Sequence, residues 1–325
     1  MPGLKQTRFR RLFANTVLVF ASAAAALVLA NIILWIFNIG KVEIYRYDPD
    51  YGYLAVPDQW PSPRGITFRI NGAGLRGPDF SPVKKPGTLR LAFVGDSVTF
   101  GGGIVSDGDT FVSLAAARLS RMSGRNIDAV NISAPGWSVQ NIKGYVARYG
   151  LYDADALIWI LPREDFYRPF SHEGMPTESG FRLQFLLSVS MRRLFALIRS
   201  KLELHRPKPT GAEDAAISTT LAANIAAFKY VLAYARDRGI RIFVIFFPEG
   251  DLPADSLPQA YGEYRATAES FGAKICDISG PIDADGGLSL FYDGVHLDPR
   301  GHQVTAALVA QCVGDSLPFL LRTAH

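Results

Sequence analysis

From Thr88 onward, short apolar runs alternate regularly with amphipathic stretches, and this alternation leaves few fold classes open. The runs are short and almost continuously apolar, which is typical of strands buried on both faces of a sheet. The stretches between them carry apolar residues at the 3.6-residue period of a helix. We expect strands at 88–95, 126–133, 155–161, 240–248 and 273–278, and helices at 110–122, 139–151, 222–239, 261–272 and 299–321. This order predicts a mostly parallel sheet with helices on both faces and a functional site at the carboxyl ends of its strands.

The first forty residues form a different kind of segment. No charged residue occurs from Leu12 to Ile39, a length that can cross a hydrocarbon core of about 30 Å. Basic residues and no acidic ones precede it, so the positive-inside rule predicts a cytoplasmic terminus at 1–12 and one transmembrane helix at 13–39. Everything after it would then lie in the periplasm or outside the cell. A cleaved signal peptide ending near "ASA" at 21–23 is the alternative, but the apolar run continues well past that point.

The rest of the chain divides into a lead-in at 40–87 and a domain at 88–322. The lead-in is rich in Tyr, Pro, Gly and Asp, which predicts loops with a short strand at 66–70. An insertion at about 163–211 interrupts the rhythm of the domain. Within it, 181–205 mixes apolar and basic residues, which suits a helix on the membrane surface, a lid over the site, or a solvated helix packed on the domain.

Charge and cysteine content exclude several classes of protein. The formal net charge is +4, and the basic residues before Leu12 account for all of it, so a nucleic-acid-binding face is not indicated. We interpret Cys276 and Cys312 as two buried small apolar residues, although one disulfide is permitted in an oxidising compartment. No Cys-x-x-Cys motif occurs, so no structural zinc site is expected, nor any other metal or organic cofactor.

The stretch "VGDSVTFGGG" places Ser97 just after the apolar run that ends at Gly95. A serine hydroxyl is a poor nucleophile until an imidazole takes its proton. Among the five histidines, His296 has the best-placed acid, because Asp293 stands three residues before it. In a turn, that carboxylate can hold one ring nitrogen while the other faces a serine. His302 is expected to pack or cap inside the last helix, and the remaining histidines have no comparable acid: His172, His205 and His325.

Three sequence blocks resemble those of a known family. "FVGDSVTFG" and "YDGVHLDPRGH" are similar to the first and last blocks of the SGNH/GDSL hydrolases, with Val98 where the family usually has leucine, and "NISAPGWSVQN" resembles the second block. The resemblance implies a flavodoxin-like three-layer α/β/α sandwich that cleaves or transfers acyl esters. It also implies that Ser97 is the nucleophile, His296 the general base and Asp293 the residue that orients it. The backbone amides of Ser97 and Gly136 would form the oxyanion hole.

The third block of the family departs from the usual pattern. "ILPREDF" stands where the family has Gly-x-Asn-Asp, so Pro162 replaces the glycine and Glu164 replaces an asparagine that donates to the oxyanion. An ionised carboxylate only accepts hydrogen bonds and would repel that charge. Three alternatives stay open: Glu164 is protonated and still donates, it points elsewhere and leaves the amides to form the hole, or the protein is weakly active or specialised. Glu164 is therefore a candidate for the oxyanion hole without an assigned role.

The lead-in also carries a motif, "INGAGLRGPDF" at 70–80, which resembles the lead-in of membrane-anchored bacterial members of the family. Asn71, Gly74 and Arg76 stand out in it. A tight turn followed by a surface arginine is the simpler interpretation.

The resemblance and the expected location together imply a serine esterase that hydrolyses O-acyl esters, acetyl esters above all, on cell-envelope or exported polysaccharide. The alternatives are an acyltransferase acting on a polysaccharide, a lipid esterase at the membrane surface, and a carbohydrate-binding member with little catalysis. The expected partners are an acylated carbohydrate or lipid and the membrane itself, and no nucleic acid.

Overall fold

The computed structural model describes residues 3–37, 41–63, 65–172, 211–248 and 258–316. Most of the expected insertion, including the 181–205 segment, lies outside these residues. Residues 43–61 and the described chain from 66 onward belong to one compact unit. Helix α1 (Gly3–Ile36) belongs to another unit and is described by itself. The domain boundaries expected from the sequence stay predictions.

Helix α1 contains the uncharged N-terminal segment as far as Ile36. Its Phe13–Ala30 stretch is long and apolar enough to cross a membrane, with a mean hydropathy of 2.1. The 34 residues of α1 extend about 50 Å at 1.5 Å per residue, which exceeds the thickness of a hydrocarbon core. A transmembrane anchor and a signal sequence both satisfy these measures.

A five-stranded sheet forms the centre of the compact unit. Its strands are β3 (Thr88–Gly95), β4 (Asn126–Ser133), β5 (Ala156–Pro162), β6 (Arg241–Phe247) and β7 (Lys274–Asp277). Their order across the sheet is β4-β3-β5-β6-β7, and every neighbouring pair is parallel. This is the flavodoxin-like strand order, which changes direction beside the first strand of the sheet. The predicted fold class is confirmed.

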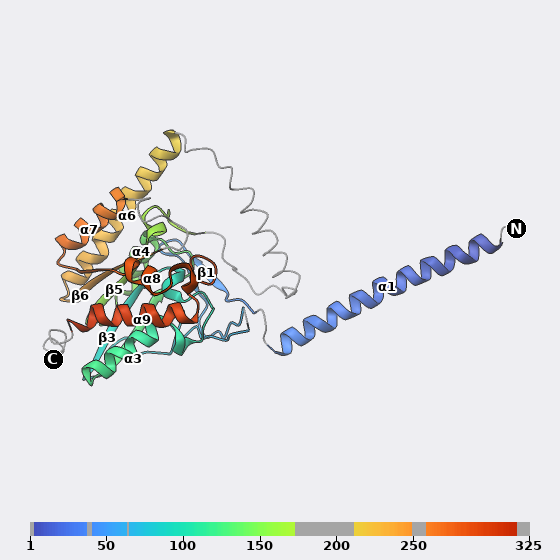
Figure 1. Cartoon of the computed structure of the whole chain (residues 1–325), viewed down its shortest axis with the longest axis horizontal. Helices are drawn as coiled ribbons and strands as arrows, with labels where there is room; N and C mark the ends of the chain where they lie inside the picture. The colour runs from blue at the N-terminus through green and yellow to red at the C-terminus, as the bar shows by residue number, and fades with distance from the viewer. Residues whose placement is uncertain (1–2, 38–40, 64, 173–210, 249–257, 317–325) are drawn as a thin grey trace. The chain divides into compact units, whose positions relative to one another are not determined.

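Helices cover both faces of this sheet (Figure 1). One layer contains α3 (Phe111–Ser123), α8 (Ser279–Asp285) and α9 (Pro299–Gly314), and the other contains α4 (Val139–Tyr149), α6 (Gly211–Arg236) and α7 (Pro258–Ser270). Along β3, Leu91 and Phe93 pack in the α3/α9 layer, whereas Ala92 and Val94 pack in the α4/α6 layer. Because successive side chains of a strand point to opposite faces, burial of both faces explains the continuous apolar runs.

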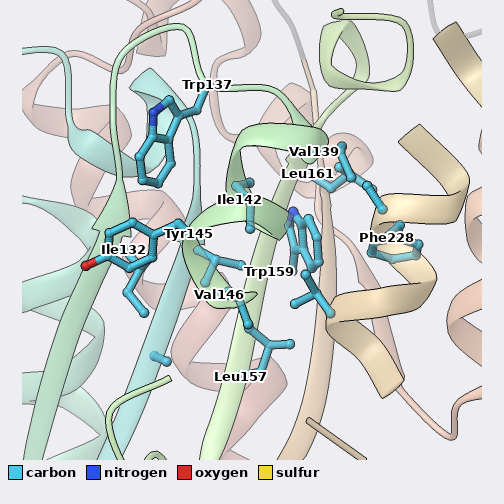
Figure 2. Close-up of a cluster of buried hydrophobic side chains, with 14 of the residues drawn as sticks. Ile132, Trp137, Val139, Ile142, Tyr145, Val146, Leu157, Trp159, Leu161 and Phe228 are labelled. Carbon is cyan, nitrogen blue, oxygen red and sulfur yellow. The ribbon is translucent and has the colours of Figure 1, made fainter. Parts of the chain in front are cut away.

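The core between β5, α4 and α6 is rich in aromatic side chains (Figure 2). Trp159 of β5 packs edge-on against Phe228 of α6, with ring centroids 4.8 Å apart. Trp137, from the loop after β4, is fully buried in the same cluster. Burial of each such side chain contributes about 1.5–3 kcal/mol. The loop that carries Trp137 is therefore anchored in the core.

The lead-in contains a hairpin, in which β1 (Tyr45–Asp48) pairs antiparallel with β2 (Gly52–Ala55). The short strand expected at 66–70 does not form in the described chain, where Ile70 makes only isolated bridges. That prediction was wrong because the side chain of Asn71 accepts two backbone N–H groups, at 3.0 and 3.1 Å, and turns the chain.

The expected surface position of Arg76 is also wrong, because this residue is only 3% exposed. Its guanidinium donates to the carbonyl oxygens of Phe100 and Val105 at 2.8 and 2.6 Å and pairs with Asp107 at 3.0 Å. These partners replace water around the charge, which is what allows a guanidinium to be buried.

The remaining elements are single turns: α2 (Ser97–Phe100), η1 (Asp107–Asp109), η2 (Arg163–Phe166) and η3 (Gly287–Leu290). Helix α6 begins well before the expected start at 222. The segment 211–221 contains several alanines but no apolar stripe, so it favours a helix without showing the helical period.

Cys276 of β7 and Cys312 of α9 form a disulfide, with Cα atoms 6.3 Å apart. The interpretation of these two residues as separate buried thiols was wrong. They lie 36 residues apart in the chain, so only the packing of α9 on the sheet brings them together.

Candidate active site

Three neighbouring strands end at the same edge of the sheet, and each is followed by a predicted site residue. Gly95 at the end of β3 pairs with Ser133 at the end of β4, and Ser97 and Gly136 follow directly. Strand β5 lies on the other side of β3, and Glu164 follows its end. Sites in open parallel sheets form at this edge, where the strand order changes direction.

Ser97 begins the single-turn helix α2. Asp96 caps this turn, because its carboxylate accepts the N–H of Val98 at 2.9 Å. Gly95 is required before it, since a Cβ at that position would lie 2.1 Å from Oγ1 of Thr99. The sharp strand-to-helix turn therefore presents Ser97 at the carboxyl edge of the sheet.

The structure brings Ser97, His296 and Asp293 together. Nε2 of His296 lies 3.0 Å from Oγ of Ser97, and Nδ1 lies 2.8 Å from Oδ2 of Asp293. The backbone N–H of His296 also donates to Oδ1 of Asp293 at 2.8 Å, so one turn fixes the orientation of the imidazole. The side chains of His296 and Asp293 are 25% and 38% exposed, so a substrate can approach them from solvent.

The environment of Asp293 sets its charge. Burial by itself would raise the pKa of Asp293, but the hydrogen bonds from the imidazole and backbone N–H of His296 and from the N–H of Val295 lower that pKa to about 2. The carboxylate is ionised at neutral pH and can only accept a hydrogen bond. Nδ1 of His296 therefore carries the proton, and Nε2 presents its lone pair to the Ser97 hydroxyl.

The N–H groups of Ser97 and Gly136 are the two expected oxyanion donors. In the part of the chain that the structure describes, neither donates to a protein acceptor. Gly136 has a φ of +79°, which glycine adopts without the strain that a side chain would cause. Two such donors near a nucleophile can stabilise negative charge on a substrate oxygen.

Glu164 forms an ion pair at this edge. Its Oε2 accepts a hydrogen bond from Nη2 of Arg168 at 2.8 Å, and its side chain is half exposed. This ion pair is compatible with the alternative in which Glu164 points elsewhere and the amides of Ser97 and Gly136 form the hole, which stays a prediction. Sequence reasoning missed Arg168, although its spacing of four residues from Glu164 is that of a helical ion pair and is the signal that could have found it.

Sequence reasoning also missed the contact between the lead-in hairpin and the loop that carries Gly136. The hydroxyl of Tyr53 donates to the carbonyl of Pro135 at 2.6 Å, and Nε1 of Trp137 donates to the carbonyl of Tyr53 at 2.9 Å. Tyr53 therefore holds both chain neighbours of Gly136. No local pattern signals this, because Tyr53 and Pro135 are 82 residues apart.

The two other histidines among the described residues, His172 and His302, do not join the candidate site. His302 is buried in α9, and its Nδ1 accepts the N–H of Phe111 at 3.1 Å, as a packing role requires. His172 stacks on a neighbouring phenylalanine, and His205 and His325 lie outside the described residues. In the described ranges of the chain, no group of three or more His, Cys, Asp or Glu side chains is arranged to hold a metal ion.

A parallel α/β/α sandwich with serine, histidine and aspartate in hydrogen-bonded series at its carboxyl edge has the arrangement typical of serine hydrolases. The model of the family described as GDSL-like Lipase/Acylhydrolase matches residues 91–309. The chain belongs to this family, and the predicted resemblance is confirmed. Membership makes the protein a hydrolase of ester bonds. No curated protein matches the chain.

Several solved structures are similar to this chain. An α/β-hydrolase from the metagenome of Lake Arreo in Spain is 17% identical, covers 70% of this chain and 95% of its own, and has a TM-score of 0.45. An acetylxylan esterase from Geobacillus stearothermophilus is 14% identical, with coverages of 70% and 94% and a TM-score of 0.46. A lipase/acylhydrolase from Enterococcus faecalis is 13% identical, with coverages of 70% and 96% and a TM-score of 0.44. At such identities a relative's substrate does not transfer to this chain.

Proposed function

We propose that this protein is a membrane-anchored serine esterase that hydrolyses O-acyl esters, acetyl esters above all, on cell-envelope or exported polysaccharide. The observation that carries the proposal is the hydrogen-bonded series Asp293–His296–Ser97, with contacts of 2.8 and 3.0 Å. The series lies at the sheet edge where the N–H groups of Ser97 and Gly136 have no protein acceptor among the described residues.

In the acylation step, Oγ of Ser97 attacks the carbonyl carbon of the ester while Nε2 of His296 takes the hydroxyl proton. Asp293 stabilises the imidazolium that forms and keeps its ring in place. The amides of Ser97 and Gly136 donate to the oxyanion. His296 then returns the proton to the alcohol oxygen, which leaves, and the acyl group remains on Ser97.

In the deacylation step, a water molecule attacks the acyl-enzyme and gives its proton to Nε2 of His296. The tetrahedral intermediate is held by the same two amides. When it collapses, the carboxylic acid leaves and the proton returns to Oγ of Ser97. The residues present supply every proton transfer, so the cycle closes on the free enzyme.

The partial exposure of the site supports a large substrate. His296 and Asp293 keep a quarter or more of their side-chain surface in solvent, so an acyl group that projects from a polymer can reach Ser97 without the polymer entering a deep cavity. The same openness admits small esters, which makes them suitable assay substrates.

Two features support a location outside the cytoplasm. Helix α1 can act as an anchor, and the basic residues at its start favour a cytoplasmic N-terminus. The Cys276–Cys312 disulfide fits an oxidising compartment, in which such bonds persist. Protease digestion of intact cells or spheroplasts tests the orientation, since the catalytic unit should be degraded without membrane rupture.

Replacement of the proposed nucleophile tests the function directly. We expect Ser97→Ala to lower hydrolysis of p-nitrophenyl acetate by the full chain in detergent on the order of 10³-fold or more. Ser81→Ala, a change of the same size at an exposed serine before β3, is the matched control and should keep full activity. Equal rates in wild type and Ser97→Ala would reject the serine esterase.

The products then distinguish the substrate classes. Release of free acetate from O-acetylated polysaccharide supports the proposal. Acetyl groups found on an added sugar acceptor, with little free acetate, would assign the protein as a transferase. Preferential release of fatty acids from phospholipid vesicles would assign it as a lipid esterase.

A further inference from the structure

The guanidinium of Arg168 lies among three carboxylates. Its Nη2 donates to Oε2 of Glu164 at 2.8 Å, and its Nη1 lies 3.1 Å from Oδ2 of Asp96 and 3.2 Å from Oδ1 of Asp165. Nη1 also donates to the carbonyl oxygen of Trp137 at 3.3 Å. One side chain therefore contacts four residues that are spread over the chain.

These four partners come from the three segments that follow β4, β3 and β5. Asp96 directly precedes Ser97, and Trp137 directly follows Gly136. Glu164 belongs to η2, which follows β5. Because these strands are neighbours in the sheet, Arg168 joins the ends of all three at the edge where the candidate site lies.

The charges in this cluster require the guanidinium. Asp96 and Asp165 are 1% and 0% exposed, and the ion pair with Arg168 offsets part of the cost of burying these carboxylates. Burial by itself would lower the pKa of Arg168, but the carboxylates of Asp165, Asp96 and Glu164 raise it above its ordinary value. Arg168 is therefore always charged, and its planar fork serves several acceptors at once, which an ammonium group does less well.

The cluster bears on the reaction because negative charge develops beside it. The oxyanion forms next to the amides of Ser97 and Gly136, and a carboxylate without a partner in the neighbouring segment would repel it. Arg168 compensates Glu164 at this point. It also contacts the residues adjacent to both amide donors, so its removal would take away a contact that the two segments share.

We propose that Arg168 is a positioning residue of the oxyanion hole. It neutralises Glu164, which stands where the family has an asparagine donor, and it holds the segments that carry the amides of Ser97 and Gly136. The inference rests on the proposed serine esterase function and adds an electrostatic component that lies outside the sequence blocks of the family.

The test is the conservative variant Arg168→Lys, assayed with p-nitrophenyl acetate as the full chain in detergent. The ammonium keeps the charge but loses the fork, so kcat should fall about tenfold or more while KM changes less than about twofold. Arg148→Lys is the matched control. Arg148 also pairs with two carboxylates, at 3.3 Å each, but it is half exposed, and both constants should stay within about twofold of wild type.

Adding Glu164→Gln to Arg168→Lys measures the coupling between the two residues. The double variant should regain part of the lost kcat, because the carboxylate that the ammonium group pairs poorly is gone. The proposal would be contradicted if the loss of kcat in the double variant equalled the product of the losses in the two single variants. It would also be contradicted if Arg168→Lys raised KM and left kcat unchanged.

Folding and function are separated by two further measurements. If Arg168→Lys loses its cooperative thermal transition and near-UV circular dichroism, the residue serves folding and the proposal is overturned. Full activity of Ser97→Ala would reject the proposed function itself. An inactive Ser97→Ala together with a fully active Arg168→Lys would reject only the role of Arg168.

Discussion

At the scale of single residues, His302 shows how far the surroundings of an imidazole decide its role. It follows His296 in the same stretch of chain, but it is only 1% exposed, and its ring stacks on that of Phe111. Burial, followed by the charge of Arg76, lowers the pKa of His302 to about 3. His302 is therefore a neutral hydrogen-bond acceptor inside the protein over the range in which an exposed histidine becomes charged.

This difference predicts how stability depends on pH. The unfolded chain binds a proton at His302 below about pH 6.5, whereas the folded chain binds it only below about pH 3. Since the pKa of His302 is lower in the folded chain, its contribution to the free energy of unfolding is complete above about pH 6.5. That contribution falls as the pH drops toward 3, by up to about 1.4 kcal/mol per pH unit. In His302→Gln, whose amide oxygen can still accept the N–H of Phe111, this part of the slope should vanish.

Urea unfolding of the full chain in detergent, followed by the fluorescence of its buried tryptophans, measures both slopes between about pH 7 and about pH 5. Parallel slopes in wild type and His302→Gln would contradict a buried neutral imidazole. A shallower slope in the variant is the expected result.

The residues that the sequence could predict are those whose chemistry is local. Asp293 and His296 lie within one turn, and Ser97 follows a recognisable strand, so their types and spacing were sufficient. Arg168 is different because its role depends on contacts with segments that lie far apart in the sequence and meet only at the edge of the folded sheet. Its short-range partner Glu164 was visible, but the contacts to Asp96 and Trp137 were not.

At the scale of elements, the glycine turn at 101–103 packs against the imidazole of the candidate site. Gly102 has a φ of +57°, and a Cβ there would lie 3.1 Å from Cδ2 of His296. Arg76 fixes the turn by donating hydrogen bonds to the carbonyls of Phe100, which precedes the turn, and Val105, which follows it. The turn therefore has little freedom to move away from an added methyl group.

This packing predicts that Gly102→Ala displaces His296 from Ser97. We expect kcat for p-nitrophenyl acetate to fall about 10- to 100-fold, because small displacements of catalytic groups have effects of that size. Stability should fall by about 1 kcal/mol, since alanine is strained at this backbone conformation. Gly108→Ala is the control, because no heavy atom lies within 4 Å of the Cβ that it adds. Similar kcat values for the two variants would show that the turn does not position His296.

The elements of the sheet were predictable and those of the lead-in were not. Strands buried on both faces produce continuous apolar runs, which the segments 88–95 and 126–133 show clearly. The hairpin β1–β2 is held by side chains such as Tyr45 and Tyr53 that pack on another part of the fold, and its two short strands carry no period that distinguishes them from loops. The false strand at 66–70 had the right composition, but the side chain of Asn71 turned the chain.

At the scale of the whole molecule, the disulfide ties the edge of the sheet to the last helix. Cys276 lies in the edge strand β7, and Cys312 lies near the end of α9. Helix α9 starts directly after the loop that carries His296. In the unfolded chain, the bond closes a loop between residues 36 apart. It therefore limits how far the segments that form β7 and α9 can separate.

Reduction should destabilise the protein without abolishing its chemistry. For a loop of this length, loss of the bond lowers the free energy of unfolding by about 3–4 kcal/mol in the chain-entropy description. We expect dithiothreitol to lower the melting temperature of the wild type while the variant carrying both Cys276→Ser and Cys312→Ser shows no response to it. A melting temperature that dithiothreitol leaves unchanged in the wild type would mean that the thiols are not bonded.

The contact between the lead-in and the site also has a practical consequence, for where this protein can be cut. The match to the family model begins at residue 91. A recombinant protein that starts there would lack Tyr53 and its backbone carbonyl. The indole N–H of Trp137 would then lose its acceptor in the core, at a cost of about 1–3 kcal/mol, and the aromatic surface under β1 and β2 would be opened to water. We therefore expect the shortest recombinant protein that folds and stays in solution without aggregating to start near Glu43, where the compact unit begins.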